Sequence, residues 1–382
     1  MSAPTDRLAS LDAFRGFAIA GMVLVNNPGS WAHIHGPLAH AEWHGCTFTD
    51  LIFPFFLFAS GLSMTISLRH RGEGGRSRWL VYRGLARRAA VLFLIGLAMA
   101  LIPAFNLGSV RVLGVLQRIA LALVLTAPVV LWGRWRAALA TIVGLCAVYL
   151  VLMLGVPVPG VDGVVAAGRL TPGNDFGAWL DRLLLGGHLW AKVGTWDPEG
   201  LVGTLTATAT LLLGVLAGQY LAAPIHAGRK APRLLLAGAA LVGAGLWMGA
   251  AFIPVNKSLW TPSYVLLTGG WSLLFLGTFH GALDEAPEGF RARARGAALP
   301  LSIYGLNALF LFVLSGLVAR LIQTVPVSVG GAAVPLKAWL FQSLAALPIS
   351  PRNASLLFAV LYDLAMFGVA WVMWRKRWVV KV

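Results

Sequence analysis

The residues with the greatest capacity for chemistry in this sequence form one short stretch, HAEWHGCTFTD, at positions 40–50, directly before a hydrophobic run. The stretch contains two imidazoles (His40 and His44), two carboxylates (Glu42 and Asp50) and one thiol (Cys46). Histidine is the commonest general base near neutral pH, a neighbouring carboxylate can orient its ring, and a cysteine can act as a nucleophile. The residue types therefore indicate acid–base or nucleophilic catalysis.

Metal binding is an alternative use of the same residues, because four of the eight histidines lie within residues 33–44. Apart from Glu42 and Asp50, no cysteine or carboxylate pattern near them would complete a zinc coordination set. The two cysteines, Cys46 and Cys146, lie far apart and form no Cys-x-x-C motif. We therefore expect catalysis without a metal.

The composition places this chemistry in a membrane. Hydrophobic residues make up 58% of the 382 residues, above the ~45–50% usual for soluble proteins. Charged residues make up only 12%, yet the net charge is +16. These basic residues cluster in short connections between apolar runs, as the positive-inside rule requires, and form no aromatic-interleaved platform for nucleic acid. We expect an all-α integral membrane protein that contacts the lipid bilayer and no nucleic acid.

A bilayer core needs about 20 apolar residues per helix. By this measure we expect one transmembrane domain over residues 1–382 with ten spans, at 9–27, 48–68, 86–104, 112–132, 137–157, 201–222, 234–254, 262–282, 299–322 and 354–374. The basic connections, 69–88 with seven arginines, 133–136, 226–233, 290–296 and the tail 374–382, all fall on one side. Both termini are therefore expected in the cytoplasm.

On the opposite side, two long segments interrupt the pattern of short connections. Residues 157–200 are expected to form an extracytoplasmic loop or lid, because loops beyond ~15 residues are usually functional or disordered. Residues 323–353 form a second extracytoplasmic excursion with room for a re-entrant helix. The stretch HAEWHG faces the same side.

Polar groups inside spans are informative because each costs several kcal/mol unless it is paired or hydrated. The ionisable ones are Asp12, Arg15, Asp50, Arg118, Arg320 and Asp363, and Asn26, Gln117, His280 and Asn307 are polar. Asp50 can also cap the second span, since a carboxylate stabilises a helix N-terminus. Gln117 and Arg118 lie too deep to reach the cytoplasm and need a polar cavity or a partner.

Six blocks of sequence carry a family resemblance: LDAFRGFAIAGMVLVNN at 11–27, HAEWHGCTFTDLIFPFFLF at 40–58, RVLGVLQRIAL at 111–121, WDPEGLVGTLTATATLLLG at 196–214, FIPVNKSLW at 252–260 and PLSIYGLNALFLFV at 300–313. In this order and spacing they resemble the heparan-α-glucosaminide N-acetyltransferase family of transmembrane acyltransferases. The resemblance is to a bacterial-type member without the amino-terminal luminal extension. It implies a homodimer that moves an acetyl group from cytosolic acetyl-CoA to an amino sugar, glucosamine-like, across the membrane.

The resemblance also implies roles for particular residues. His40 matches the family's active-site histidine, Asn26 its active-site asparagine, and Asp50 its carboxylate at the start of the second helix. The candidates for binding acetyl-CoA are Arg83, Arg87, Arg88, Gln117 and Arg118. The candidates for binding the acceptor are Glu42, Trp43, His44, Asp197 and Glu199.

In the chemistry that we expect, His40 takes the proton of the acceptor amine, Asp50 or Glu42 orients its ring, and Asn26 stabilises the oxyanion. Several alternatives stay open. Cys46 could carry the acetyl group as a covalent relay. The three arginines could be a topology signal alone, and Gln117 with Arg118 could either line the pantetheine path or brace the core. A secondary transporter, or a scaffold without catalysis, would also place polar residues inside spans.

Overall fold

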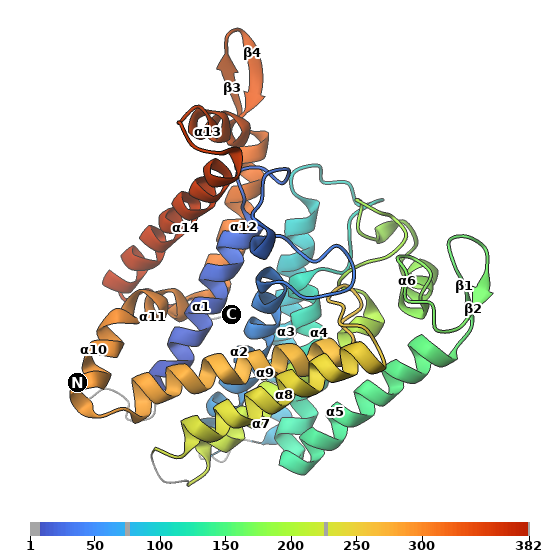
Figure 1. Cartoon of the computed structure of the whole chain (residues 1–382), viewed down its shortest axis with the longest axis vertical. Coiled ribbons are helices and arrows are strands. Elements are labelled where there is room, and N and C mark those ends of the chain that lie inside the picture. Colours follow the sequence, from blue (N-terminus) through green and yellow to red (C-terminus); the bar gives the residue numbers. More distant parts are fainter. Residues whose placement is uncertain (1–7, 73–76, 225–227, 381–382) are drawn as a thin grey trace.

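The computed structural model describes residues 8–72, 77–224 and 228–380 as a bundle of helices with two short β-hairpins (Figure 1). Among these residues, nine helices are long and apolar enough to cross a bilayer, and a bent pair, α11 and α12, makes a tenth. The predicted all-α membrane class is confirmed, with nine candidate spans among the described residues, or ten if the bent pair is one span. Parts of the predicted basic connections, residues 73–76, 226–227 and 381–382, lie outside the described residues.

The spanning helices are α1 (Ala9–Asn26), α2 (Phe48–Gly72), α3 (Arg78–Leu101), α4 (Val115–Trp132), α5 (Trp135–Leu150) with the π turn Val151–Gly155, α7 (Leu201–Ala222), α8 (Lys230–Ala251), α9 (Pro262–His280) with the π turn Gly281–Glu285, α11 (Leu299–Leu306), α12 (Ala308–Thr324) and α14 (Pro351–Arg375). The shorter elements are the 3-10 turns Gly36–Leu38 and Gly186–His188, α6 (Phe176–Leu185), α10 (Glu288–Ala297), α13 (Leu336–Ala345), and the hairpins β1 (Val158–Pro159) with β2 (Val165–Ala166) and β3 (Pro326–Val329) with β4 (Ala332–Pro335).

Two spans differ from the prediction. Helix α3 begins at Arg78 instead of residue 86, because arginine is a good helix former whose long side chain can reach water from the membrane boundary. The span predicted at 299–322 is bent by 81° at Asn307, between α11 and α12. The Asn307 amide there bonds to the backbone of the C-terminal tail, so its polar group is satisfied outside the helix.

The connections between spans gather at two opposite ends of the bundle. The end that we call the loop end carries residues 27–47, 102–114, 156–200, 252–261 and 325–350. The basic end carries, among the described residues, 77, 133–134, 223–224, 228–229, 286–298 and the tail 376–380. In Figure 1, α13 and the β3–β4 hairpin project beyond α12 and α14 at the loop end. That the basic end faces the cytoplasm stays a prediction from the positive-inside rule.

Glycines let the central helices approach closely, as is usual in membranes. A Cβ atom on Gly16 of α1 would overlap the carbonyl oxygen of Leu301 in α11, and one on Gly61 of α2 would overlap that of Leu211 in α7. Helices α2 and α7 are thereby packed backbone to backbone at the centre of the bundle.

The segment predicted as a loop or lid, residues 157–200, has a folded interior. The buried Asp175 accepts a hydrogen bond from the Ala178 amide (2.9 Å) and so caps α6. The buried Asp181 accepts one from the Leu201 amide (3.0 Å) and so caps α7. Burial raises the pKa of Asp181 to about 7 and that of Asp175 to about 6. Two buried carboxyl groups therefore fasten this segment to the bundle.

We expect Gly16→Ala to destabilise the protein, because the added Cβ would separate α1 from α11. Overpacking of this kind costs about 1–3 kcal/mol. Thermal unfolding in detergent measures the effect against Gly144→Ala, whose Cβ meets nothing within 4 Å. Equal unfolding temperatures for the two variants would contradict the close packing of α1 on α11.

We also expect stability to fall as the pH rises from 5 to 7. In this window folded Asp181 holds its proton, while the same side chain in the unfolded protein, with its ordinary pKa of 3.8, has released it. Each pH unit then costs on the order of 1 kcal/mol. Unfolding temperatures from pH 5 to 8 should fall less steeply for Asp181→Asn than for wild type. Asp162→Asn is the control. The hydrogen bond from Arg169 lowers the pKa of Asp162 to about 2, so Asp162 releases its proton below this pH window. A slope unchanged in Asp181→Asn would refute the assignment.

Candidate active site

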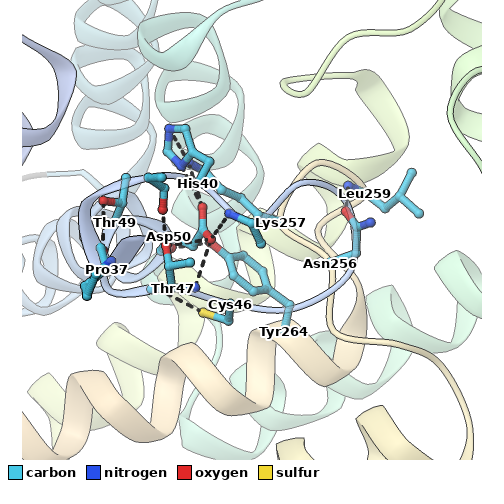
Figure 2. Close-up of polar contacts among 12 residues, drawn as sticks. Pro37, His40, Cys46, Thr47, Thr49, Asp50, Asn256, Lys257, Leu259 and Tyr264 are labelled. Atoms are coloured by element: carbon cyan, nitrogen blue, oxygen red, sulfur yellow. Dashed lines mark hydrogen bonds and ion pairs between the residues drawn. The ribbon is translucent and has the colours of Figure 1, made fainter. Parts of the chain in front are cut away.

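The centre of the site is a hydrogen-bonded pair of His40 and Asp50 at the loop end of α2 (Figure 2). The His40 Nδ1 lies 2.7 Å from the Asp50 Oδ1. Asp50 is fully buried, whereas 43% of the His40 side chain is exposed. An ionised Asp50 accepts the Nδ1 proton, which leaves Nε2 as the basic atom of a neutral ring. The pair thus combines a buried orienting carboxylate with an accessible base.

Asp50 is held by its own loop as well. Its Oδ2 accepts hydrogen bonds from the backbone amides of Ala41 and Thr47, both at 3.0 Å, and from the Thr47 hydroxyl at 3.1 Å. It lies in the first turn of α2, where the helix dipole favours a negative charge. Both predicted uses of Asp50, capping the helix and orienting His40, are therefore present in one geometry.

Lys257 joins this pair from a connection more than 200 residues later in the chain. Its Nζ lies 3.5 Å from the Asp50 Oδ1, and 3.0 Å and 3.4 Å from the two ring nitrogens of His40. Burial lowers the pKa of the Lys257 ammonium, and the Asp50 carboxylate acts in the opposite sense. Sequence reasoning assigned no role to this lysine, although it lies in the block FIPVNKSLW.

The turn that carries Lys257 is rigid. The Lys257 carbonyl accepts a hydrogen bond from the Trp260 amide (3.1 Å), and Trp260 has a positive φ of 54° although it is fully buried. The Asn256 side chain accepts one from the Leu259 amide (2.9 Å). The Gly45 amide donates to the Val255 carbonyl (2.7 Å) and so joins this turn to the loop of His40. The lysine is therefore preorganised beside His40.

Cys46 is close to the pair but poorly suited to nucleophilic attack. Burial raises the pKa of its thiol to about 12, and the Asp50 carboxylate adds to the effect. Since the thiolate is the reactive form, Cys46 stays in its unreactive thiol form near neutral pH. The alternative of a covalent acetyl relay through Cys46 loses support.

The four histidines of residues 33–44 have four different partners. His33 stacks on Phe341 with ring centroids 6.5 Å apart, and the His35 Nε2 lies 3.0 Å from the Asn353 Oδ1. The His44 Nδ1 lies 3.3 Å from the Asn256 Nδ2, whereas His40 pairs with Asp50. Across the described ranges, no three or more His, Cys, Asp or Glu side chains are grouped closely enough to hold a metal ion.

Two other predicted residues of the loop do not approach the pair. Asn26, the last residue of α1, is exposed, and within residues 8–72 and the other described parts no hydrogen bond joins it to His40 or Asp50. Glu42 is also exposed, so the carboxylate that contacts the imidazole is that of Asp50. Trp43 donates a hydrogen bond from Nε1 to the Leu170 carbonyl (2.7 Å) and so fixes the segment 157–200 against the loop.

The predicted acceptor-binding carboxylates, Asp197 and Glu199, bind Arg111 instead. The Arg111 Nε and Nη2 donate to Asp197 at 2.8 Å and 2.5 Å, and Nη2 also donates to Glu199. Burial alone would raise the pKa of Glu199, but the Arg111 guanidinium holds it below its ordinary value. Both carboxylates therefore share one cationic partner within the protein, and their binding of an acceptor stays a prediction.

Gln117 and Arg118 are buried near the loop end of α4. The Arg118 guanidinium lies 4.9 Å from the centroid of the Trp260 ring, and its Nη2 donates to the Gly200 carbonyl (3.2 Å). Its Nε and Nη1 have no partner among the described residues. Of the two predicted roles, bracing the core agrees better with these contacts, because Arg118 supports the tryptophan that shapes the Lys257 turn.

The basic end contains a cavity of about 810 Å³ between α1, α2, α3, α4 and α12. Its polar lining includes Asp12, Arg15, Ser60, Ser63, Arg87 and Arg88. Arg83 is exposed and is not among its lining residues. A volume of this order suits a ligand of cofactor size. Phe56 also lines the cavity and lies six residues from Asp50, which is about 9 Å along the axis of α2.

Comparisons with known proteins show similarity to one family. Residues 7–168 match the family model described as heparan-alpha-glucosaminide N-acetyltransferase, catalytic. The chain is 28% identical over 376 residues to the heparan-alpha-glucosaminide N-acetyltransferase of Homo sapiens, covering 82% of this chain and 53% of that protein. It is 27% identical over 371 residues to that of Mus musculus, with 81% and 53% covered.

The chain spans about half the length of these two relatives. The family match takes in the loop of His40, all of α2 with Asp50, and the helices that carry Arg87, Arg88 and Arg118. The turn of Lys257 lies beyond it but within the block FIPVNKSLW. Residues 7–168 thus match the catalytic model of the heparan-alpha-glucosaminide N-acetyltransferase family, and the chain is a distant homologue of the two mammalian proteins over most of its length.

Proposed function

We propose that the protein transfers an acetyl group from acetyl-CoA, bound at the basic end, to the amine of an amino sugar at the loop end. One observation carries the proposal. Helix α2 bears the His40–Asp50 pair at its loop end and lines the arginine-bearing cavity further along its length. A reaction across the membrane requires this arrangement, because the donor and the acceptor approach from opposite sides.

On the donor side, the guanidinium groups of Arg15, Arg87 and Arg88 are suited to the phosphates of the CoA nucleotide. The apolar lining from α2 and α4, including Phe56 and Ile119, suits the less polar pantetheine arm. The remaining distance to Asp50 is about two helical turns. The cavity therefore fits a donor that reaches from the basic end toward His40.

On the acceptor side, the Nε2 of His40 accepts the proton of the attacking amine, and Asp50 stabilises the imidazolium that results. Lys257 lies where its ammonium can stabilise the negative charge on the thioester oxygen as the tetrahedral state forms. The role proposed for Asn26 would require its exposed side chain to turn toward the same oxygen. Cys46, as a thiol, takes no part in this route.

The acceptor that we propose is a small amino sugar such as glucosamine, since the mammalian relatives are named for a glucosaminide. The homodimer and the bacterial inner membrane are proposals that rest on the family resemblance and on the basic connections. Uptake of a sugar by proteoliposomes without dependence on acetyl-CoA would favour the transporter alternative.

His40→Gln should slow the transfer strongly. Loss of the general base lowers kcat by roughly 10²–10⁴-fold, and Lys257→Met should lower it by about 10²–10³-fold through loss of oxyanion stabilisation. The assay uses full-length protein in nanodiscs with radiolabelled acetyl-CoA and glucosamine, and follows N-acetylglucosamine. Glu288→Gln changes an exposed carboxylate of α10, away from the site, and should retain activity. If Asn26→Asp keeps wild-type turnover, Asn26 has no role in the mechanism. If His40→Gln keeps wild-type turnover, the proposed function is wrong.

Arg87→Gln should raise the KM for acetyl-CoA about tenfold while leaving kcat largely unchanged, because loss of a phosphate contact of ~1.4 kcal/mol weakens binding uniformly. Arg83→Gln removes a neighbouring positive charge that does not line the cavity, and should have a smaller effect. If both variants keep the wild-type KM, these arginines serve as a topology signal alone.

A further inference from the structure

The C-terminal tail folds back against the bend between α11 and α12. The Asn307 side chain donates to the Trp378 carbonyl and accepts from the Val380 amide, both at 2.9 Å. The Trp378 amide donates to the Met373 carbonyl (2.8 Å), and Arg377 has a positive φ of 57°. Residues 377–380 are therefore held as a wall beside α12 and α14.

This wall separates two adjoining cavities at the basic end. The larger, of about 860 Å³, is mostly apolar and is lined by Phe310 of α12, by Ala365, Gly368, Val369, Val372 and Met373 of α14, and by the tail. The smaller, of about 390 Å³, is lined by Leu306, Trp374, Arg375, Arg377 and the tail. Both cavities share Arg377, Trp378 and Val379. An apolar compartment thus adjoins one with two guanidinium groups.

Three consecutive cations, Arg375, Lys376 and Arg377, surround the smaller cavity or lie beside it. The Arg375 guanidinium lies 4.9 Å from the centroid of the Trp371 ring, and the Lys376 Nζ lies 5.0 Å from that of Trp378. None of the three forms an ion pair with a carboxylate within the described parts of the chain. The site therefore has an unbalanced positive charge, and two of its three cations, Arg375 and Lys376, lie over tryptophan rings.

The positive-inside rule explains the sign and the position of these cations. It does not explain why the hydrogen bonds of Asn307 hold the tail so that a positively charged cavity adjoins an apolar one. A soluble phosphate would use only the charged cavity. A second copy of the chain across a two-fold axis would bring the same three cations together, and they would repel each other. A ligand with one anionic group and one long apolar group matches both compartments.

We propose that this tail groove binds one anionic phospholipid. The acyl chain lies along Gly368, Val369 and Val372 in the larger cavity, and the phosphate lies against Arg375 and Arg377. Basic pockets between spans at the cytoplasmic side are suited to such head groups, and each cation near the membrane surface contributes about 1 kcal/mol. Tryptophan is favoured at this depth of the bilayer because its ring is amphipathic.

Native mass spectrometry of the full chain tests the proposal, with phosphatidylglycerol and phosphatidylcholine of identical acyl chains as probes. Wild type should retain one phosphatidylglycerol with at least a tenfold preference over phosphatidylcholine. The double variant Arg375→Gln with Arg377→Gln should lose this preference. The control is the double variant Arg134→Gln with Arg136→Gln, which removes two arginines from another basic connection. Arg136 also lies over a tryptophan ring, and this control should retain the preference for phosphatidylglycerol.

A second variant tests the apolar compartment without changing charge. A Cβ on Gly368 meets nothing within 4 Å, so Gly368→Leu should fold and fill the cavity, and phosphatidylglycerol binding should fall about tenfold. Unfolding temperatures verify that each variant is folded. Undiminished binding in Gly368→Leu, an unchanged preference in the arginine double variant, or equal competition by soluble glycerol phosphate would overturn the proposal.

Discussion

The arrangement of the loop end depends on one buried charge, the carboxylate of Asp50. A carboxylate without partners would be very costly there, so each oxygen is occupied: Oδ1 by His40 and Lys257, and Oδ2 by the loop amides and Thr47. The Asp50 backbone carbonyl accepts a hydrogen bond from the buried Tyr264 hydroxyl of α9 (2.5 Å). The hydrogen bonds and the ion pair of Asp50 thereby hold the α1–α2 loop, the turn before α9, and α9 itself against one another.

Helix α2 transmits this constraint through the membrane. Its first turn carries Asp50, and its later turns line the cavity at the basic end with Phe56, Ser60 and Ser63. Gly61 allows α7 to lie directly against it, so α2 has little freedom to shift along its axis. The distance between the donor cavity and His40 is consequently set by the rise of one helix, about 1.5 Å per residue.

The sequence predicted the ten spans, because hydropathy and charge bias act locally, and it predicted His40 and Asp50, which are ten residues apart and lie in a block that resembles a family. Contacts between distant segments could not be predicted. Lys257 is separated from His40 by 217 residues, and Arg111 from Asp197 by 86, so no local pattern indicates either pair. The sequence likewise did not show that Arg111 pairs with Asp197 and Glu199. The bend at Asn307 was missed because one asparagine barely alters the hydropathy of a span, whereas its amide can bind a tail that lies more than 70 residues further along.

That bend places two different ligand environments on opposite sides of one short segment. Ala308 and Leu309 line the donor cavity, whereas Leu306 and Phe310 line the cavities beside the tail. A straight span would have continued its hydrogen-bond ladder through Asn307 and left the tail without its clamp. Because Leu309 and Phe310 are consecutive residues that line different cavities, a change in the packing of Phe310 bears directly on the lining of the donor cavity. The polar residue that interrupts the ninth crossing therefore connects the proposed lipid site to the proposed acetyl-CoA site.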